Sequence, residues 1–159
     1  MTPTDQLFQA LRAGNAAAVR TLVAQDASLL SARDSRGSTP LVLATYLEQE
    51  EVVKALVAAG ADVNARDAAG NTPLMGVTFK DYRTMAEYLL AQGADPNSTN
   101  GNGGTALIFA ATFNKPAMAE LLIEAGADVA HRDADGLTAA DHARNQGHTD
   151  LADSLSARR

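Results

Sequence analysis

The sequence predicts an all-α solenoid, in which helix–turn–helix units stack side by side and carry short β-turn or hairpin tips. Three observations predict this fold. The motif Gly-Ala-Asp begins at Gly60, Gly93 and Gly126, 33 residues apart each time. A turn tetrad and a helix opening that starts with Thr recur with the same spacing. The 159 residues include only four Phe, three Tyr and no Trp, which favours helices packed through small side chains.

Each unit begins with a tight turn. The tetrads are DSRG, DAAG, NGNG and DADG, at residues 34–37, 67–70, 100–103 and 133–136. Asp or Asn in the first position and Gly in the fourth is the preference of a type I turn. The tip at 100–103 has additional glycines, Gly101 and Gly104. Because glycine loses the most backbone freedom on folding, we expect this tip to be the most mobile of the four.

A pair of helices follows each turn. The next column holds a residue suited to cap a helix N-terminus with its hydroxyl, namely Thr39, Thr72, Thr105 and Thr138. A second helix follows in the sequence EVVKALVAA, whose residues Val52, Val53 and Leu56 fall on one face. The Gly of the Gly-Ala-Asp motif then suits a left-handed helix end. One helix pair cannot cover its own apolar face, so the units must stack.

This pattern resembles the ankyrin repeat family, through DxxGxTPL, the second-helix sequence VVKALVAAGADVN and the 33-residue period. The resemblance covers nearly the whole chain. It implies one domain over residues 1–159, built as an N-terminal cap repeat at 4–33, full repeats at 34–66, 67–99 and 100–132, and a C-terminal cap repeat at 133–159. Caps at both ends lead us to expect a complete small protein that is a monomer.

The sequence departs from the family pattern in two columns. The His that usually follows TPL is replaced by Val42, Met75, Ile108 and Asp141. The Gly that usually separates the two helices is replaced by Glu48, Asp81 and Asn114. If this turn keeps its left-handed geometry, it strains Glu48 by about 1–2 kcal/mol and Asn114 by less.

Charge and composition exclude several functions. The net charge of −6 is a poor match for nucleic acid, which binds clustered Lys and Arg. The chain has no Cys, so it has no disulfide and no thiolate nucleophile. No run of 18 apolar residues predicts a membrane span, and the N-terminus does not have the pattern of a secretory signal. We expect a cytoplasmic protein.

No arrangement of residues points to a metal, a cofactor or a catalytic centre. The three histidines, His131, His142 and His148, form no i, i+4 pair, and we expect them to be exposed or in turns. Asp62, Asp95 and Asp128 recur one repeat apart, too far to share one cation, so we expect them to bond to loop backbone. A triad drawn from Asp141, His142 and a serine has no support beyond adjacency. The sequence therefore predicts no enzyme, metal or cofactor.

The resemblance implies where a partner binds. Ankyrin proteins commonly contact partners through the turn tips and the concave inner face. Carried onto this chain, the inner-face candidates are Tyr46, Leu47, Phe79, Lys80, Thr112 and Phe113, and the tip candidates are Arg33, Arg36, Arg66 and Arg132. Exposed aromatic residues beside Arg have the composition of an interface hot spot. Two alternatives remain open: the aromatic residues pack on each other or fill the gaps left by the missing His column, and each Arg pairs with a neighbouring turn Asp.

The function predicted from these features is that of a non-catalytic protein–protein interaction module. Its partner is a protein, with an acidic patch that the tip arginines attract. The alternative is a regulatory, inhibitory or accessory subunit of a specific enzyme or toxin, of the antidote or stress-response type. A purely structural spacer, with no partner, is a third reading.

Overall fold

A computed structural model of the chain describes residues 1–158, in which five pairs of α-helices follow one another and no strand is present. The helices are α1 (Pro3–Arg12), α2 (Ala16–Gln25), α3 (Pro40–Tyr46), α4 (Glu50–Ala58), α5 (Pro73–Phe79), α6 (Arg83–Ala91), α7 (Ala106–Thr112), α8 (Pro116–Glu124), α9 (Ala139–Asn145) and α10 (Thr149–Ser156), with a short 3₁₀ turn, η1 (Ala27–Ser31), after α2.

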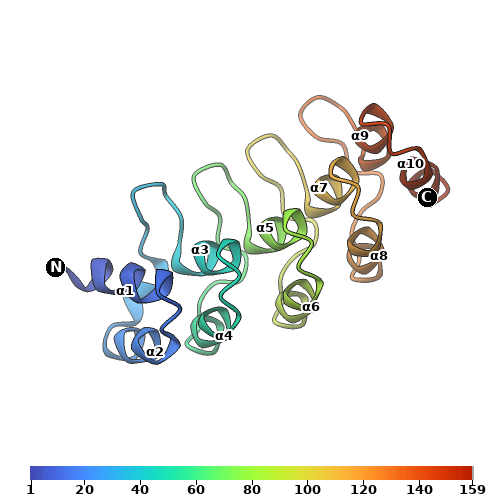
Figure 1. Ribbon diagram of the computed structural model, residues 1–159. Coiled ribbons are helices and arrows are strands. Elements are labelled where there is room, and N and C mark those ends of the chain that lie inside the picture. Colours follow the sequence, from blue (N-terminus) through green and yellow to red (C-terminus); the bar gives the residue numbers. More distant parts are fainter. Residues whose placement is uncertain (159) are drawn as a thin grey trace.

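The helices form two parallel rows. Figure 1 shows α1, α3, α5, α7 and α9 in one row, the second helix of each pair in the other, and the turn tips projecting as loops beside the first row. The core lies between the rows and between successive units, and its largest buried side chains include Leu41, Leu56, Leu74, Leu107 and Leu122. The predicted all-α solenoid is confirmed, with hydrogen-bonded turns and no hairpin strands at the tips of residues 1–158.

The threonine column begins the first helices as predicted. The buried Thr39 hydroxyl accepts a hydrogen bond from the Val42 N–H at 3.2 Å. Thr72, Thr105 and Thr138 make the same bond three residues ahead. Each such cap satisfies one backbone donor at a helix start, and loss of one typically costs about 1 kcal/mol. The His that usually follows TPL in the family, and that this chain replaces, is therefore not required to begin the helices.

The turn between the two helices of a unit is left-handed. Glu48, Asp81 and Asn114 have φ angles of 57°, 57° and 55°, in the region that favours glycine. The predicted strain is therefore present at this turn. The turn reverses the chain directly after the first helix, so the last residues of that helix lie at the surface.

The junctions between units are bonded by asparagine side chains. The Asn64 side chain accepts a hydrogen bond from the Asp95 N–H at 2.7 Å and donates one to the Gly93 carbonyl at 3.2 Å. Asn97 makes the equivalent bonds one repeat later, to the N–H of Asp128 and the carbonyl of Gly126. Asp62 accepts a hydrogen bond from the Asn64 N–H at 2.9 Å, and its counterparts Asp95 and Asp128 do the same. The expectation that these aspartates bond to loop backbone is confirmed.

The tip at 100–103 is tied to both of its neighbours. The Gly101 N–H donates to the Ala69 carbonyl at 2.9 Å, and the Asn102 carbonyl accepts from the Ala134 N–H at 2.9 Å. A Cβ at residue 101 would lie 3.2 Å from the Ala69 oxygen, so the extra glycine permits this close approach. These bonds argue against the expectation that this tip is the most mobile, which stays a prediction.

Candidate protein-binding surface

Six candidate residues lie where the first helices end, and we call this set the rim: Tyr46, Leu47, Phe79, Lys80, Thr112 and Phe113. Tyr46, Phe79 and Thr112 are the last residues of their helices, and the following residue caps each helix. The exposed fractions of Tyr46, Phe79 and Phe113 are 54%, 49% and 43%. Because the left-handed turn follows directly, these side chains are held at the surface and not in the core.

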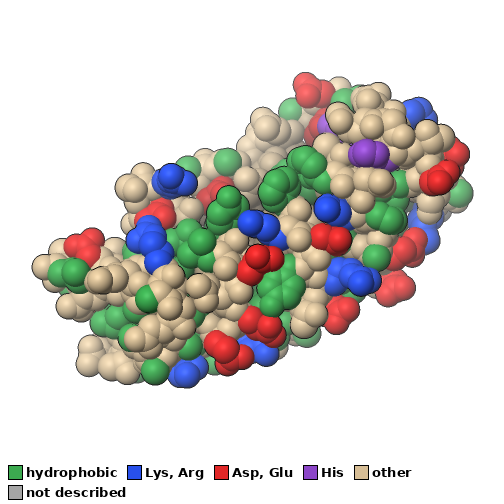
Figure 2. Space-filling view, in the orientation of Figure 1, with side chains coloured by type: hydrophobic (Ala, Val, Ile, Leu, Met, Phe, Trp, Pro, Cys, Tyr) green, Lys and Arg blue, Asp and Glu red, His purple; other side chains and the backbone are tan. Residues whose placement is uncertain are grey.

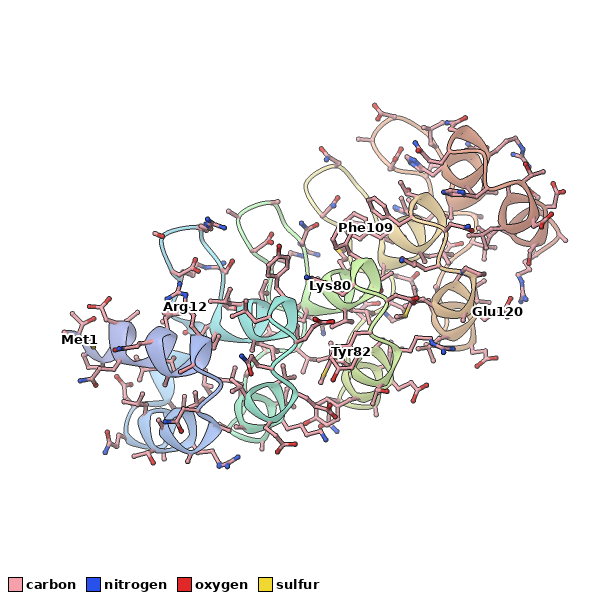
Figure 3. The ribbon with its side chains drawn as sticks, viewed as in Figure 1. Met1, Arg12, Lys80, Tyr82, Phe109 and Glu120 are labelled. Atoms are coloured by element: carbon pink, nitrogen blue, oxygen red, sulfur yellow. The ribbon has the colours of Figure 1, made fainter. Side chains whose placement is uncertain are left out.

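Rim residues of successive units contact one another diagonally. The Lys80 ammonium lies over the Tyr46 ring, 4.5 Å from its centroid. The Phe79 and Phe113 rings meet edge to face with their centroids 5.0 Å apart. Figure 3 shows Lys80 at the end of α5, in the same row of helices as Arg12 at the end of α1. Phe79 and Phe113 therefore pack on each other, as the alternative reading allowed, whereas Tyr46 packs against Lys80, and all three rings remain about half exposed.

The rim is a strip of exposed apolar side chains interrupted by Lys80. Leu47 adjoins Tyr46, which contacts Lys80, and Phe79, next to Lys80 in the chain, contacts Phe113. Apart from Met1, the exposed large hydrophobic side chains among residues 1–158 are Tyr46, Leu47, Phe79 and Phe113. Single exposed apolar residues need no explanation, whereas a contiguous group marks an interaction site.

The four tip arginines divide into two kinds. Arg33 donates hydrogen bonds to the carbonyls of Gly37 at 2.6 Å and Arg66 at 2.7 Å. Arg132 donates to the Gly136 carbonyl at 2.8 Å and lies 3.9 Å from the Asp141 carboxylate. Arg33 therefore binds carbonyls and no turn aspartate, whereas Arg132 binds a tip carbonyl and also pairs with Asp141 at the start of α9.

Arg36 and Arg66 differ from this first kind. Within the described part of the chain, neither guanidinium makes an ion pair or a side-chain hydrogen bond. Both residues are exposed. Of the predicted basic edge, these two guanidinium groups are the ones that remain available to a partner.

A groove opens between the tips 34–37 and 67–70, and we call it the N-terminal groove. Its volume is about 810 Å³, and its walls include Arg12, Ser35, Arg36, Tyr46, Leu47 and Ala68. In Figure 2, hydrophobic and basic side chains lie side by side over the row of first helices. The groove therefore joins the N-terminal part of the rim to a basic tip.

The carboxylates of this groove are bound to the turns. Asp34 Oδ1 accepts from the N–H groups of Arg36 at 2.9 Å and Ser38 at 3.0 Å, and its side chain is only 8% exposed. Asp67 bonds equivalently to the N–H groups of Ala69 and Asn71. The Arg12 side chain is 55% exposed, and its guanidinium lies 3.8 Å from the Asp34 carboxylate. Of the charged side chains at the groove, those of Arg12 and Arg36 are exposed, whereas Asp34 is largely covered.

The histidines were expected to be exposed or in turns: His131 and His148 lie in loops between helices, whereas His142 lies in α9, and all three are partly buried. His131 Nε2 lies 2.7 Å from the Gly103 carbonyl, and His148 Nε2 lies 3.1 Å from the Thr112 carbonyl. His142 Nε2 lies 2.6 Å from Asp133 Oδ2. Each ring thus bonds a neighbouring loop or helix end.

Asp141 and His142, the pair considered for a triad, have separate partners. The Asp141 carboxylate accepts from the Thr138 N–H at 3.0 Å. That backbone hydrogen bond, with the Thr138 hydroxyl, lowers the pKa of Asp141. His142 is bonded to Asp133 instead. Within residues 1–158, no three His, Asp or Glu side chains lie close enough together to bind a metal ion, and no helix has the length and apolar character needed to cross a membrane.

Sequence reasoning found the rim and missed the groove. The rim residues belong to repeat columns, so the period alone identifies them. Arg12 lies in the first unit, outside the turn columns, and reaches the groove only because α1 ends beside the tip 34–37. The sequence signal that could have indicated the groove was an arginine, Arg12, at the end of the first helix of the first unit.

Comparison with known proteins agrees with this architecture. A sequence profile described as "Ankyrin repeats (3 copies)" matches residues 4–67 and 74–158. The chain is also similar to "Ankyrin repeat and SAM domain-containing protein 6" of Danio rerio, with 41% identity over 58 residues. That match covers 36% of this chain and 8% of the zebrafish protein. Ankyrin repeats are generally protein–protein interaction modules. The chain belongs to the ankyrin repeat family.

Proposed function

We propose that this chain is a non-catalytic module that binds a partner protein through the rim and the adjoining tips. The observation that carries the proposal is the strip of exposed Tyr46, Leu47, Phe79 and Phe113, which Lys80 links across the units. Large aromatic side chains bury much area at low entropic cost, and such residues typically dominate binding energy. The location of the strip beside unpaired arginines adds the polar surroundings that interfaces have.

The test compares two triple variants of the full chain as bait in host-cell extract, with mass spectrometry of the captured proteins. We expect Tyr46→Ala, Phe79→Ala and Phe113→Ala together to lose the partner, because hot-spot residues contribute about 2 kcal/mol each. The control variant carries Glu51→Ala, Glu87→Ala and Glu124→Ala, at exposed residues of the second-helix row. It should still capture the partner. Undiminished capture by the aromatic variant would refute the rim as the binding site.

Folding has to be verified for each bait. Phe79 and Phe113 contact each other, and an aromatic pair contributes about 0.5–1.5 kcal/mol, so the aromatic variant should melt slightly earlier but fold. An unfolded aromatic variant would show that these rings serve the core.

A regulatory or inhibitory role toward an enzyme or toxin is a narrower form of the same proposal. The identity of the captured protein decides it: recovery of one enzyme, whose activity falls when the purified chain is added, is the expected result for that role. Cytoplasmic location and the monomeric state remain predictions, tested by cell fractionation and by sedimentation of the purified chain.

A further inference from the structure

We infer that the N-terminal groove binds an acidic segment of the partner protein, with carboxylates on either side of one apolar side chain. This inference rests on the proposed function and adds the chemistry of the partner. It also assigns the groove, and not the whole rim, as the place where the charged part of the partner lies.

Charge is the first argument. The groove exposes the guanidinium groups of Arg12 and Arg36, and the Lys80 ammonium lies against its wall at Tyr46. The two carboxylates that line it, Asp34 and Asp67, each accept two backbone N–H bonds inside their own turns. A groove with exposed cations and turn-bound carboxylates complements a negative ligand, within a chain whose net charge is −6.

The position of Arg36 in its column is the second argument. The same tip position holds Arg36, Ala69, Asn102 and Asp135 in successive units. This tip position therefore changes from basic to acidic along the stack, while Arg132 remains beside the last tip. A negative segment is attracted to the first tips and repelled at the last, which fixes where along the stack it binds.

The apolar wall is the third argument. Tyr46 and Leu47 are 54% and 37% exposed and line the groove together with Arg36. Its volume of about 810 Å³ is within the range of sites that enclose a drug-sized ligand, enough for a few residues of a partner. A ligand with charge alone would leave this apolar surface in water, so the segment carries an aliphatic or aromatic side chain between its acidic residues.

The experiment selects a phage-displayed library of random 12-residue peptides on the full chain. We expect the enriched peptides to contain Asp or Glu on both sides of a Leu, Ile, Phe or Tyr. Binding of the best synthetic peptide should weaken on raising salt, because the paired charges are near the surface. Arg36→Glu with Lys80→Glu should weaken it by about tenfold or more, the range for truncated charge pairs at interfaces.

Two matched controls make the result specific. Arg83→Glu makes one of the two charge reversals of the test variant at an exposed residue of α6, and Asp135→Lys makes one reversal of opposite sign in the tip column at the far end of the stack. Each should alter binding by less than about twofold, the level of distant surface substitutions. An equal loss with Arg83→Glu would reduce the effect to net charge and overturn the inference.

Other outcomes separate this inference from the proposed function. Neutral or basic peptides that lose binding in the Tyr46→Ala, Phe79→Ala variant would overturn the acidic partner and leave the rim as a binding site. No enrichment would overturn the inference, while partner capture by the rim is measured independently. A dimer in sedimentation that Tyr46→Ala dissociates would assign the groove to a second copy of the chain and also overturn it.

Discussion

The tips at the two ends of the molecule share one turn geometry and differ in what joins them. The tips 67–70, 100–103 and 133–136 are linked in series by backbone hydrogen bonds, from Gly101 to Ala69 and from Ala134 to Asn102. Within residues 1–158, no backbone hydrogen bond joins the tip 34–37 to the tip 67–70. There the connection is the Arg33 side chain, bonded to the Arg66 carbonyl. The N-terminal groove opens at this junction.

This difference shows that one repeat sequence can join its tips in two ways. At the later junctions a backbone N–H of one tip bonds to a carbonyl of the next. At the first junction the tips approach as closely, since a Cβ at Gly37 would lie 2.9 Å from the Ala68 Cβ, but the link is the Arg33 side chain. Four predictions test this distinction, from the largest expected effect to the smallest.

The first prediction concerns glycines of one column in different surroundings. Gly70 and Gly136 have φ angles of 84° and 76°, so Ala at either position is strained by about 1 kcal/mol. A Cβ at Gly70 would lie 2.8 Å from the Gly101 nitrogen, whereas a Cβ at Gly136 would meet nothing within 4 Å. We expect Gly70→Ala to destabilise the fold by about 2–3 kcal/mol, because it also disturbs the bond between tips, and Gly136→Ala by about 1 kcal/mol.

Urea unfolding of the two variants measures this difference. Equal midpoints would mean that the close approach of the tips 67–70 and 100–103 contributes nothing to stability.

The second prediction concerns the last linked tip and pH. Burial raises the pKa of Asp133, but hydrogen bonds from His142 and from the N–H groups of Leu137 and Asp135 lower it more, so the pKa is below its ordinary 3.8. A carboxyl group with a depressed pKa in the folded state stabilises the fold above its unfolded pKa, and this contribution disappears as the pH falls through the folded pKa. Asp133→Asn should therefore cost about 1–2 kcal/mol near pH 6, and this cost should shrink as the pH falls below 3.8 and through the depressed pKa of folded Asp133.

Thermal or urea unfolding at a series of pH values measures this effect. A difference between wild type and Asp133→Asn that stays constant with pH would show that the charge of Asp133 plays no part. His142→Ala is the companion variant, and at neutral pH it should lose part of the same stabilisation.

The third prediction separates two arginines at the first junction. Arg33→Ala removes two bonds to tip carbonyls and should cost about 1 kcal/mol of stability, given their exposure. Arg36→Ala removes no side-chain bond of the described residues and should change stability by less than about 0.5 kcal/mol. Binding of an acidic peptide should show the reverse order. If Arg36→Ala destabilised the fold more than Arg33→Ala, the assignment of structural and binding roles would be exchanged.

The fourth prediction concerns amide hydrogen exchange at one tip position. The N–H groups of Gly101 and Ala134 are bonded across tips, whereas those of Ser35 and Ala68 have no hydrogen-bond partner within residues 1–158. A bond of about 1 kcal/mol protects an amide by about fivefold to tenfold. We expect Gly101 and Ala134 to exchange more slowly by that factor, and faster exchange at Gly101 would restore the sequence-based view of a mobile glycine tip.

Local features of this fold could be predicted from the sequence, whereas contacts between units could not. The Thr39 cap and the left-handed Glu48 depend on residues within one turn, so a repeat column identifies them. The bond from Arg33 to the Arg66 carbonyl and the edge-to-face contact of Phe79 with Phe113 join residues about one repeat apart. Such contacts depend on how closely the stacked units approach, which the period does not specify. The rim was predictable because its residues belong to repeat columns. The groove was not, because it depends on how the stacked units approach one another.

The asparagine bridges have a consequence for mechanical load. Asn64 and Asn97 fasten the units 34–66, 67–99 and 100–132 to one another, whereas the same column holds Ser31 before them and Ala130 after them. Because each unit touches only its neighbours, a pulling force along the stack acts on these junctions in series. We expect the outer units to detach first and at lower force, leaving a central block of three units that still carries Tyr46, Phe79 and Phe113.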